Sequence, residues 1–152
     1  MPKFESTRPV PHTADEMFAL VADVEKYPEF LPLCQALKVR SEREKDGKRL
    51  LVADMTVAYK MVRETFTSQV LLKPEDRQIE VSYVNGPFKF LDNRWDFVPT
   101  GEGTCEVKFF IEYEFKSRTL GMLMGAMFDY AFRRFAVAFE QRADKVYGQR
   151  EG

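Results

Sequence analysis

The fold of this chain is decided by one stretch near its end, residues 119–147, TLGMLMGAMFDYAFRRFAVAFEQRADKVY. The stretch has no proline, and its polar residues recur at the spacing of a helix, at Asp129, Arg133, Glu140 and Asp144. We therefore predict one long helix with a solvent-facing polar stripe. Its first half carries no charge over residues 120–128, so its apolar surface is wider than the roughly 100° stripe that one packing surface requires. The pattern leaves two explanations open: a helix gripped by a curved sheet, or a helix that also borders a lipid-like ligand.

Length and charge set the first limits. The chain has 152 residues, enough for one buried core, and no repeat, linker or low-complexity tract indicates a second unit, so we predict a single domain over residues 1–152. Its 23 Lys and Arg nearly balance its 24 Asp and Glu, giving a net charge of -1. No general positive field would draw it to nucleic acid, and we expect no DNA partner. No apolar run approaches the ~18 residues of a membrane-spanning helix.

Cysteine and histidine usage gives no sign of a metal site. Cys34 and Cys105 fall in different predicted elements, and the single histidine, His12, adds no spaced ligand pattern. Buried, reduced thiols are typical of a cytosolic protein. The chain begins with the polar segment MPKFESTRPVPHT, which lacks the pattern of a signal or transit peptide. We expect a cytoplasmic protein.

The rest of the chain predicts one sheet. Residues 3–8 are expected to form a strand, and Thr13 with Glu16 forms a capping box that begins a helix ending at Tyr27 and Pro28. A compact apolar corner, YPEFLPLC, follows. Six segments over residues 37–116 then alternate polar and apolar residues between turn signals, as in an antiparallel meander. One polar and one apolar face per strand predicts an α+β fold, in which a curved antiparallel sheet is covered by the long helix.

Strand parity and helix periodicity predict which side chains face each other between sheet and helix. The inward residues of the sheet are expected to be Met55, Met61, Phe66, Tyr83, Leu91, Trp95, Phe109, Ile111 and Tyr113; those of the helix are expected to be Leu123, Met127, Phe128, Ala131, Phe132 and Phe135. Periodicity alone does not separate a closed core from a cavity. The methionines favour a cavity slightly, because they adapt to irregular apolar shapes.

Known catalytic patterns are missing from the sequence. A nucleophile–base pair would need His12, which lies in a predicted turn, and no G-x-S-x-G motif or glycine-rich phosphate loop is present. Arg94 and Asp96 share a strand face and are expected to form a surface ion pair rather than a site. We predict no catalytic residues.

Three blocks give the chain a family resemblance: YPEFLP-x-C, GPF-x-x-L-x-N-x-W-x-F and AFEQRA-x-x-x-YG. They resemble the coenzyme Q-binding START-like family, which groups a mitochondrial quinone-binding protein with bacterial members, one of them described as a ribosome-association toxin. The resemblance covers almost the whole chain in the same order. It implies a helix-grip fold, with a short helical segment after the first strand and the final helix lying in the sheet around a hydrophobic tunnel.

The resemblance also implies function. We expect a non-enzymatic protein that binds ubiquinone or a similar isoprenoid lipid, as a ligand and not a cofactor, that supports respiration and that contacts the inner membrane transiently. The alternative is a ribosome-binding regulator or toxin, favoured by Arg133, Arg134, Arg142 and Lys145 on the expected exposed side of the last helix but not by the near-neutral charge. A cyclase- or dehydrase-like enzyme is the weaker alternative, because the fold by itself says little about activity.

The expected ligand-binding residues combine the family's blocks with the inward parity. The corner contributes Phe30, Leu31 and Leu33, and Leu33 stands where many relatives carry tryptophan, so the ligand fit at the tunnel mouth is expected to differ. The remaining residues expected in the tunnel are Met55, Phe66, Pro87, Phe88, Leu91, Trp95, Leu123, Met127, Phe128, Phe132 and Phe135.

Overall fold

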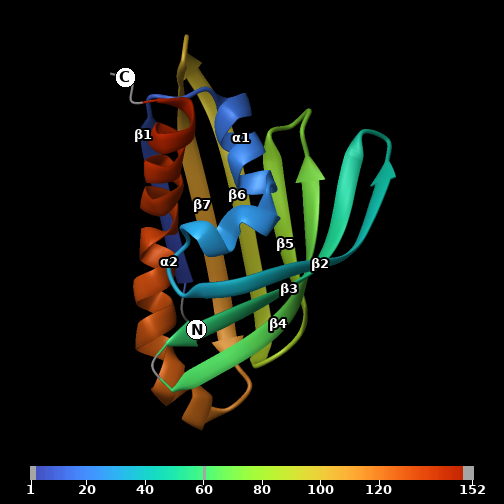
Figure 1. Ribbon diagram of the computed structural model, residues 1–152, viewed down its shortest axis with the longest axis vertical. Helices are drawn as coiled ribbons and strands as arrows, with labels where there is room; N and C mark the ends of the chain where they lie inside the picture. The colour runs from blue at the N-terminus through green and yellow to red at the C-terminus, as the bar shows by residue number, and fades with distance from the viewer. Residues whose placement is uncertain (1–2, 60, 149–152) are drawn as a thin grey trace.

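The computed structural model describes residues 3–59 and 61–148 (Figure 1). Within them, seven strands and two α-helices follow one another, with one 3-10 helix between. In chain order the elements are β1 (Lys3–Val10), α1 (Ala14–Ala22), η1 (Val24–Glu29), β2 (Cys34–Lys45), β3 (Lys48–Tyr59), β4 (Val62–Lys73), β5 (Gln78–Asn85), β6 (Phe88–Gly101), β7 (Thr104–Phe115) and α2 (Arg118–Tyr147). The six predicted meander strands and the long final helix are confirmed.

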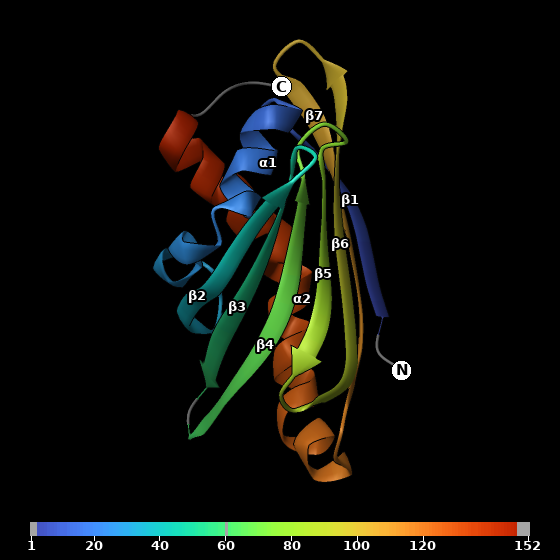
Figure 2. The same ribbon diagram turned by 90° about the vertical axis from the view of Figure 1, so that its right-hand side faces the viewer.

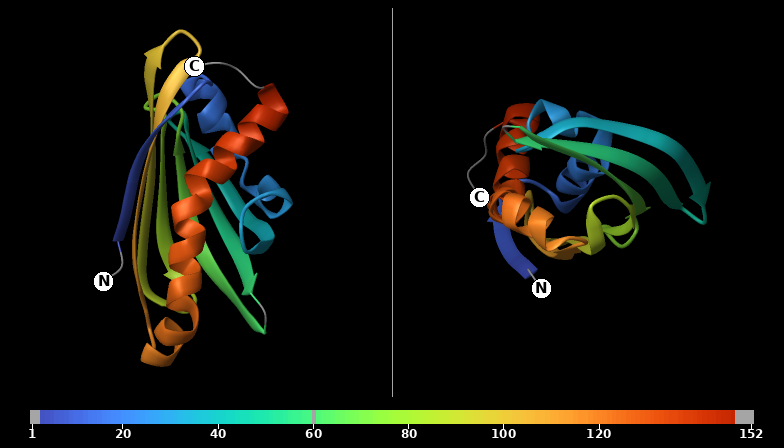
Figure 3. Two further views of the ribbon diagram at one scale, coloured as in Figure 1. Left: turned by 90° about the vertical axis from the view of Figure 1, so that its left-hand side faces the viewer. Right: turned by 90° about the horizontal axis from the view of Figure 1, so that it is seen from below.

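The strands form one antiparallel sheet in the order β1-β7-β6-β5-β4-β3-β2. Each strand from β2 to β7 pairs with its neighbour in sequence, and β1 joins at the far edge, where Val10 lies opposite Cys105. The sheet curves around α2, as the side and end views show (Figure 2 and Figure 3). The expected α+β helix-grip architecture is therefore confirmed.

Helix α2 forms where the sequence predicts it because both its ends and its inward face are satisfied. Ser117 caps the N-terminus by accepting a hydrogen bond from the Leu120 backbone N–H at 3.0 Å, and Gly148, with φ 88°, ends the helix. One stripe is buried against the sheet: Met124, Phe128, Ala131, Phe132, Ala136, Phe139 and Ala143. Two side chains near the start of the fold fix its second half, since His12 Nε2 lies 2.7 Å from Asp144 Oδ1 and Arg8 pairs with Glu140.

The first helix is shorter than the sequence indicates. The capping box is present, with both Thr13–Glu16 hydrogen bonds at 3.0 Å. However, α1 ends at Ala22 rather than at Tyr27, because Asp23 leaves the helical region with ψ 69°. The chain then turns into η1, which contains Pro28. The Tyr27 hydroxyl donates to the Val21 carbonyl and holds this corner against α1.

Two residues expected to face inward lie on the surface. Met61 is 99% exposed because it stands in the turn between β3 and β4, beyond the part of the sheet that α2 covers. Leu123 is 63% exposed because the inward stripe begins at Met124, which places Leu123 on the side of α2 that also carries exposed Tyr130.

A tight backbone contact between β4 and the turn before β6 predicts one sensitive glycine. Gly86 has φ +145°, and a Cβ added there would lie 2.5 Å from the Phe66 Cβ. We expect Gly86→Ala to lower the free energy of unfolding by roughly 3 kcal/mol or more, from backbone strain and overlap together. Gly103→Ala is the control, with φ +77° but nothing within 4 Å of the added Cβ, and should cost only about 1–2 kcal/mol. Equal losses for the two variants in urea unfolding would contradict the contact.

Candidate functional site

An apolar cavity of ≈ 70 Å³ lies between α2, the η1 corner and the concave face of the sheet. The corner and α2 contribute Val24, Tyr27, Leu31, Phe132, Phe135 and Phe139; the sheet contributes Leu37, Ala53, Met55, Phe66, Ser68, Val70, Val81, Leu91, Asn93, Trp95 and Ile111. A cavity that holds a benzene ring measures about 150 Å³, so in this conformation the space fits only a few heavy atoms.

Aromatic rings close one wall of the cavity. Trp95, which is 4% exposed, packs edge-to-face on Phe109 at 4.6 Å and on Phe139 at 5.2 Å between ring centroids. Phe139 also meets Tyr27 at 5.3 Å and Phe30 at 5.1 Å. Because edge-to-face pairs add to the gain from burial, this cluster joins sheet, corner and helix into one rigid wall.

An ion pair fixes the η1 corner on α2. Arg142 Nη2 donates to Glu29 Oε1 at 2.6 Å, and the guanidinium lies 5.1 Å from the Phe30 ring centroid. The hydrogen bond from Arg142 lowers the pKa of Glu29. The Arg142 side chain is only 15% exposed. The expectation that Arg142 stands on the free surface of the last helix is therefore wrong, because the corner folds over it.

Besides the indole of Trp95, three lining side chains carry a hydroxyl or an amide. The Tyr27 hydroxyl is engaged with the Val21 carbonyl, and burial raises the pKa of this phenol. Asn93 Nδ2 donates to the Phe110 carbonyl at 2.9 Å. Ser68 Oγ is buried and has no hydrogen-bond partner among the described residues. The lining residues include no carboxylate and no imidazole, so they offer hydrogen bonds rather than an acid–base pair.

The two cysteines are buried thiols. Burial raises the pKa of both Cys34 and Cys105 to about 11, so both are protonated at neutral pH. Over residues 3–59 and 61–148, no group of three or more His, Cys, Asp and Glu side chains could hold a metal ion.

Half of the residues expected in a ligand tunnel reach this cavity. Those that line it are Leu31, Met55, Phe66, Leu91, Trp95, Phe132 and Phe135. Those that lie elsewhere are Phe30, Leu33, Pro87, Phe88, Leu123, Met127 and Phe128.

The expected tunnel does not extend towards the start of α2, because rings fill that space. Phe88 is fully buried and lies 5.4 Å from Phe66, 4.9 Å from Phe115 and 5.4 Å from Phe128 between centroids. Met127 packs at the edge of this core. Phe30 packs against Phe139 and the Arg142 guanidinium without lining the cavity, and Leu33 takes φ 66° just before β2 begins.

Sequence reasoning missed the two polar side chains that the sheet contributes to the cavity. Ser68 lies on the inward parity of β4 between Phe66 and Val70, and Asn93 lies on the inward parity of β6 between Leu91 and Trp95. A polar residue at an inward position of an otherwise apolar strand face is the signal that could have found them.

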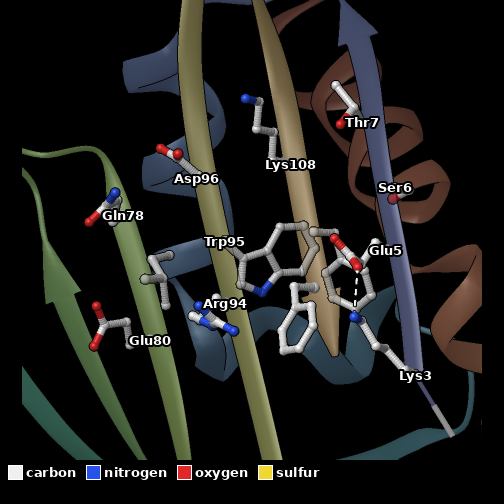
Figure 4. A pocket seen from close by; sticks show the side chains of 13 residues that line it. Lys3, Glu5, Ser6, Thr7, Gln78, Glu80, Arg94, Trp95, Asp96 and Lys108 are labelled. Atoms are coloured by element: carbon white, nitrogen blue, oxygen red, sulfur yellow. Dashed lines mark ion pairs between the residues drawn. The ribbon is translucent and has the colours of Figure 1, made fainter. Parts of the chain in front are cut away.

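A second hollow, of ≈ 680 Å³, opens on the outer face of the sheet (Figure 4). Phe110, which breaks the alternation of β7, lies there with the Arg94 guanidinium 4.3 Å from its ring centroid. Arg94 pairs with Asp92 at 3.6 Å, so the expected pair with Asp96 is wrong. Six charged residues balance in its lining and so select no ligand charge: Lys3, Arg94 and Lys108 against Glu5, Glu80 and Asp96.

A curved antiparallel sheet that closes on a long C-terminal helix, with an apolar cavity between them, defines a protein of the START-like, helix-grip class. The chain belongs to the family described as polyketide cyclase / dehydrase and lipid transport, whose model matches residues 10–140. That description joins enzymes and lipid carriers, so membership does not decide between the two. Within the described residues, no helix is both long enough and apolar enough to cross a membrane.

Relatives at moderate identity match nearly the whole chain. A ribosome association toxin, RatA, of Vibrio cholerae is 37% identical over 140 residues, which cover 92% of this chain and 94% of the relative. RatA of Rickettsia prowazekii is 33% identical over 149 residues, which cover 96% of this chain and 99% of the relative. A mitochondrial coenzyme Q-binding protein homologue of Xenopus laevis is more distant, at 28% identity, and the match covers 98% of this chain but 61% of that protein.

Solved structures agree with the fold. The solution structure of an 18 kDa protein from Caulobacter crescentus matches with a TM-score of 0.79 and 34% identity, covering 98% of this chain and all of the other. An aromatase/cyclase from a Streptomyces species matches with a TM-score of 0.75 at 18% identity, and the match covers 95% of this chain and 94% of the other. This similarity concerns the fold alone.

The aromatic wall gives a stability prediction. Phe139→Ala removes the ring that contacts Tyr27, Phe30 and Trp95, so we expect a loss of about 3–5 kcal/mol in the free energy of unfolding and a red shift of Trp95 emission. The control is Phe110→Ala, the same change on the outer face of the sheet, with an expected loss of about 1 kcal/mol. If both variants lost the same stability, Phe139 would not join the three elements as described.

Proposed function

We propose that this protein associates with the ribosome. The similarity to proteins named ribosome association toxin supports this, because it runs at 33% and 37% identity through nearly the full length of both chains. The ribosome is thus favoured over ubiquinone as the main partner, since the coenzyme Q-binding relative is more distant.

One end of the molecule has the character of a contact surface. It comprises the β3–β4 turn and the first half of α2, which lie at the same end in Figure 1 and Figure 3. Five of the seven large apolar side chains that are exposed in the described residues occur there: Tyr59, Met61, Met122, Leu123 and Tyr130. We call this set the apolar end. Exposed large apolar side chains are typical of surfaces that bind a partner, and a partner that covers the apolar end must reach from the β3–β4 turn to the start of α2, which stand apart in Figure 2.

Unpaired cations accompany the apolar end. Arg63, Lys116 and Arg118 are exposed, and none of the three forms an ion pair with a described residue. Arg134 is also exposed, with its guanidinium stacked 3.5 Å from the Tyr130 ring centroid. Cations free of acidic partners can meet RNA phosphates, and the apolar side chains can meet bases or ribosomal protein. On α2 itself the basic stripe is weaker than the sequence suggests, because Arg133 pairs with Asp129 and Arg142 is covered.

Co-sedimentation with purified bacterial ribosomes tests the proposal. We expect the wild-type protein to pellet with ribosomes at 0.15 M salt and to bind more weakly as salt rises. The variant Arg63→Glu/Arg118→Glu should lose about tenfold or more in affinity, because two phosphate-facing cations are reversed. The matched control, Arg43→Glu/Lys48→Glu, reverses two exposed cations of the β2–β3 hairpin and should bind as the wild type does.

Two outcomes would contradict ribosome association through the apolar end. One is equal binding by both double variants. The other is a wild-type protein that stays in the supernatant with ribosomes but floats with vesicles of anionic phospholipid in a flotation assay. That result would indicate that this end binds a membrane.

The cavity supports a second function, binding of a small apolar ligand without catalysis. We propose ubiquinone or a similar isoprenoid lipid as the occupant, and the observation that favours it is an apolar lining that includes Trp95 but no carboxylate or imidazole. A quinone ring exceeds the present volume of ≈ 70 Å³, so the half-buried Leu37, Met55 and Phe135 would have to move aside. Methionine adapts to such changes because its side chain is unbranched and flexible.

Fluorescence of Trp95, the single tryptophan, tests this second function. Titration with duroquinone, a fully methylated benzoquinone, should quench Trp95 saturably, and mass spectrometry of an organic extract of the purified protein should find an isoprenoid quinone. Ala53→Phe, which fills the cavity from β3, should abolish the saturable part. Ubiquinone would not be the ligand if two results were obtained together. One is linear, collisional quenching that is identical in the wild type and the variant, and the other is an extract without quinone.

A further inference from the structure

Ser68 is a polar exception within an apolar wall. It is 6% exposed and lines the cavity from the middle of β4. The inward positions on either side of it are Phe66 and Val70, and the residue opposite it on β3 is Ala53. The pairing of β4 with β5 is irregular between Thr67 and Ser68, so the hydroxyl stands at a local break in the ladder.

The Ser68 hydroxyl has no hydrogen-bond partner among the described residues. Burying a hydroxyl without a partner lowers stability, and alanine at the same position would avoid the loss. Four other described side chains carry a buried unpartnered atom, Ser6, His12, Tyr113 and Arg142, but none of them lines this cavity. Ser68 alone therefore combines an unsatisfied hydroxyl with access to an enclosed apolar space.

The neighbouring polar groups do not compete for the same role. The Asn93 amide N–H is committed to the Phe110 carbonyl, and the Tyr27 hydroxyl to the Val21 carbonyl. Of the polar atoms in the cavity lining, the Ser68 hydroxyl is therefore the one that is fully buried and has no partner among the described residues. Such a site matches a molecule with one hydrogen-bonding oxygen on an apolar body.

We infer that Ser68 is the polar anchor of the cavity and donates its hydroxyl hydrogen to a carbonyl oxygen of an otherwise apolar ligand. The inference rests on the second proposed function, ligand binding in the cavity, and names the chemical class of the ligand and the residue that orients it. The carbonyl end would point to β4, and the rest of the ligand would extend past Met55 and Phe135, the half-buried part of the lining.

A pair of ligands that differ in one carbonyl group tests the anchor. Acetophenone carries the carbonyl, and ethylbenzene is its counterpart without it. The indole N–H signal of Trp95, the one tryptophan, reports binding of both in NMR titrations. Ser68→Ala should weaken acetophenone binding about five- to tenfold, the usual size of one hydrogen bond, and change ethylbenzene binding less than twofold.

The melting temperature separates a ligand anchor from a serine that only stabilises the fold. Replacing a stabilising serine by alanine would lower the Tm. Because Ser68→Ala removes an unpartnered polar atom, its Tm should be equal to or above that of the wild type. The control is Ser82→Ala, the same substitution at an exposed position of the adjacent strand β5, which should leave both ligand affinities unchanged.

The results of these titrations distinguish the proposed role of Ser68 from ligand binding in the cavity as a whole. If Ser68→Ala weakened the binding of both ligands equally, or changed the affinity for acetophenone less than twofold, Ser68 would not be the anchor, although the cavity would still bind ligands. A wild-type protein that binds neither ligand would overturn the cavity function itself.

Discussion

The structure depends on the packing of one stripe of α2, centred on Phe128, Phe132 and Phe139, against the concave face of the sheet. Phe139 is the junction, because its ring meets the sheet at Trp95 and the corner at Tyr27. The second half of α2 is tied to the start of the fold through His12 and Asp144, and Arg142 holds the corner down. These contacts pull the η1 corner over the cavity and close one side of it.

The two proposed functions use different halves of α2. Its second half is covered by the corner and by α1, and Arg142 there is paired with Glu29 and mostly buried. Its first half extends with the β3–β4 turn beyond that cover, so Met122 and Leu123 stay in solvent. The wide apolar surface of the helix is therefore divided between an internal core and an exposed end. A ribosome contact at the exposed end and a ligand in the cavity are compatible, because they use different faces of the same helix.

The sequence predicted the fold closely because its signals are local and repeated. Alternation marks six strands, and the 3.6-residue period marks α2 to within one residue at its start. The site was predicted only in part. The family resemblance placed Phe88 in the tunnel and helix periodicity turned Phe128 inward, but neither shows whether rings meet or leave space, and these two rings meet. Leu123 and Met61 were misplaced because the border of the covered surface depends on how far α2 extends past the sheet. The Arg142–Glu29 pair joins residues 113 positions apart, a separation that no local pattern encodes.

We propose that the ribosome binds at the apolar end. Hydrogen–deuterium exchange of the protein with and without bacterial ribosomes tests it most directly. We predict that added protection is confined to the β3–β4 turn and the first half of α2, while the β2–β3 hairpin and the outer face of the sheet exchange as in the free protein. Protection confined to the β2–β3 hairpin or to the outer sheet face around Phe110, with the apolar end unchanged, would contradict it.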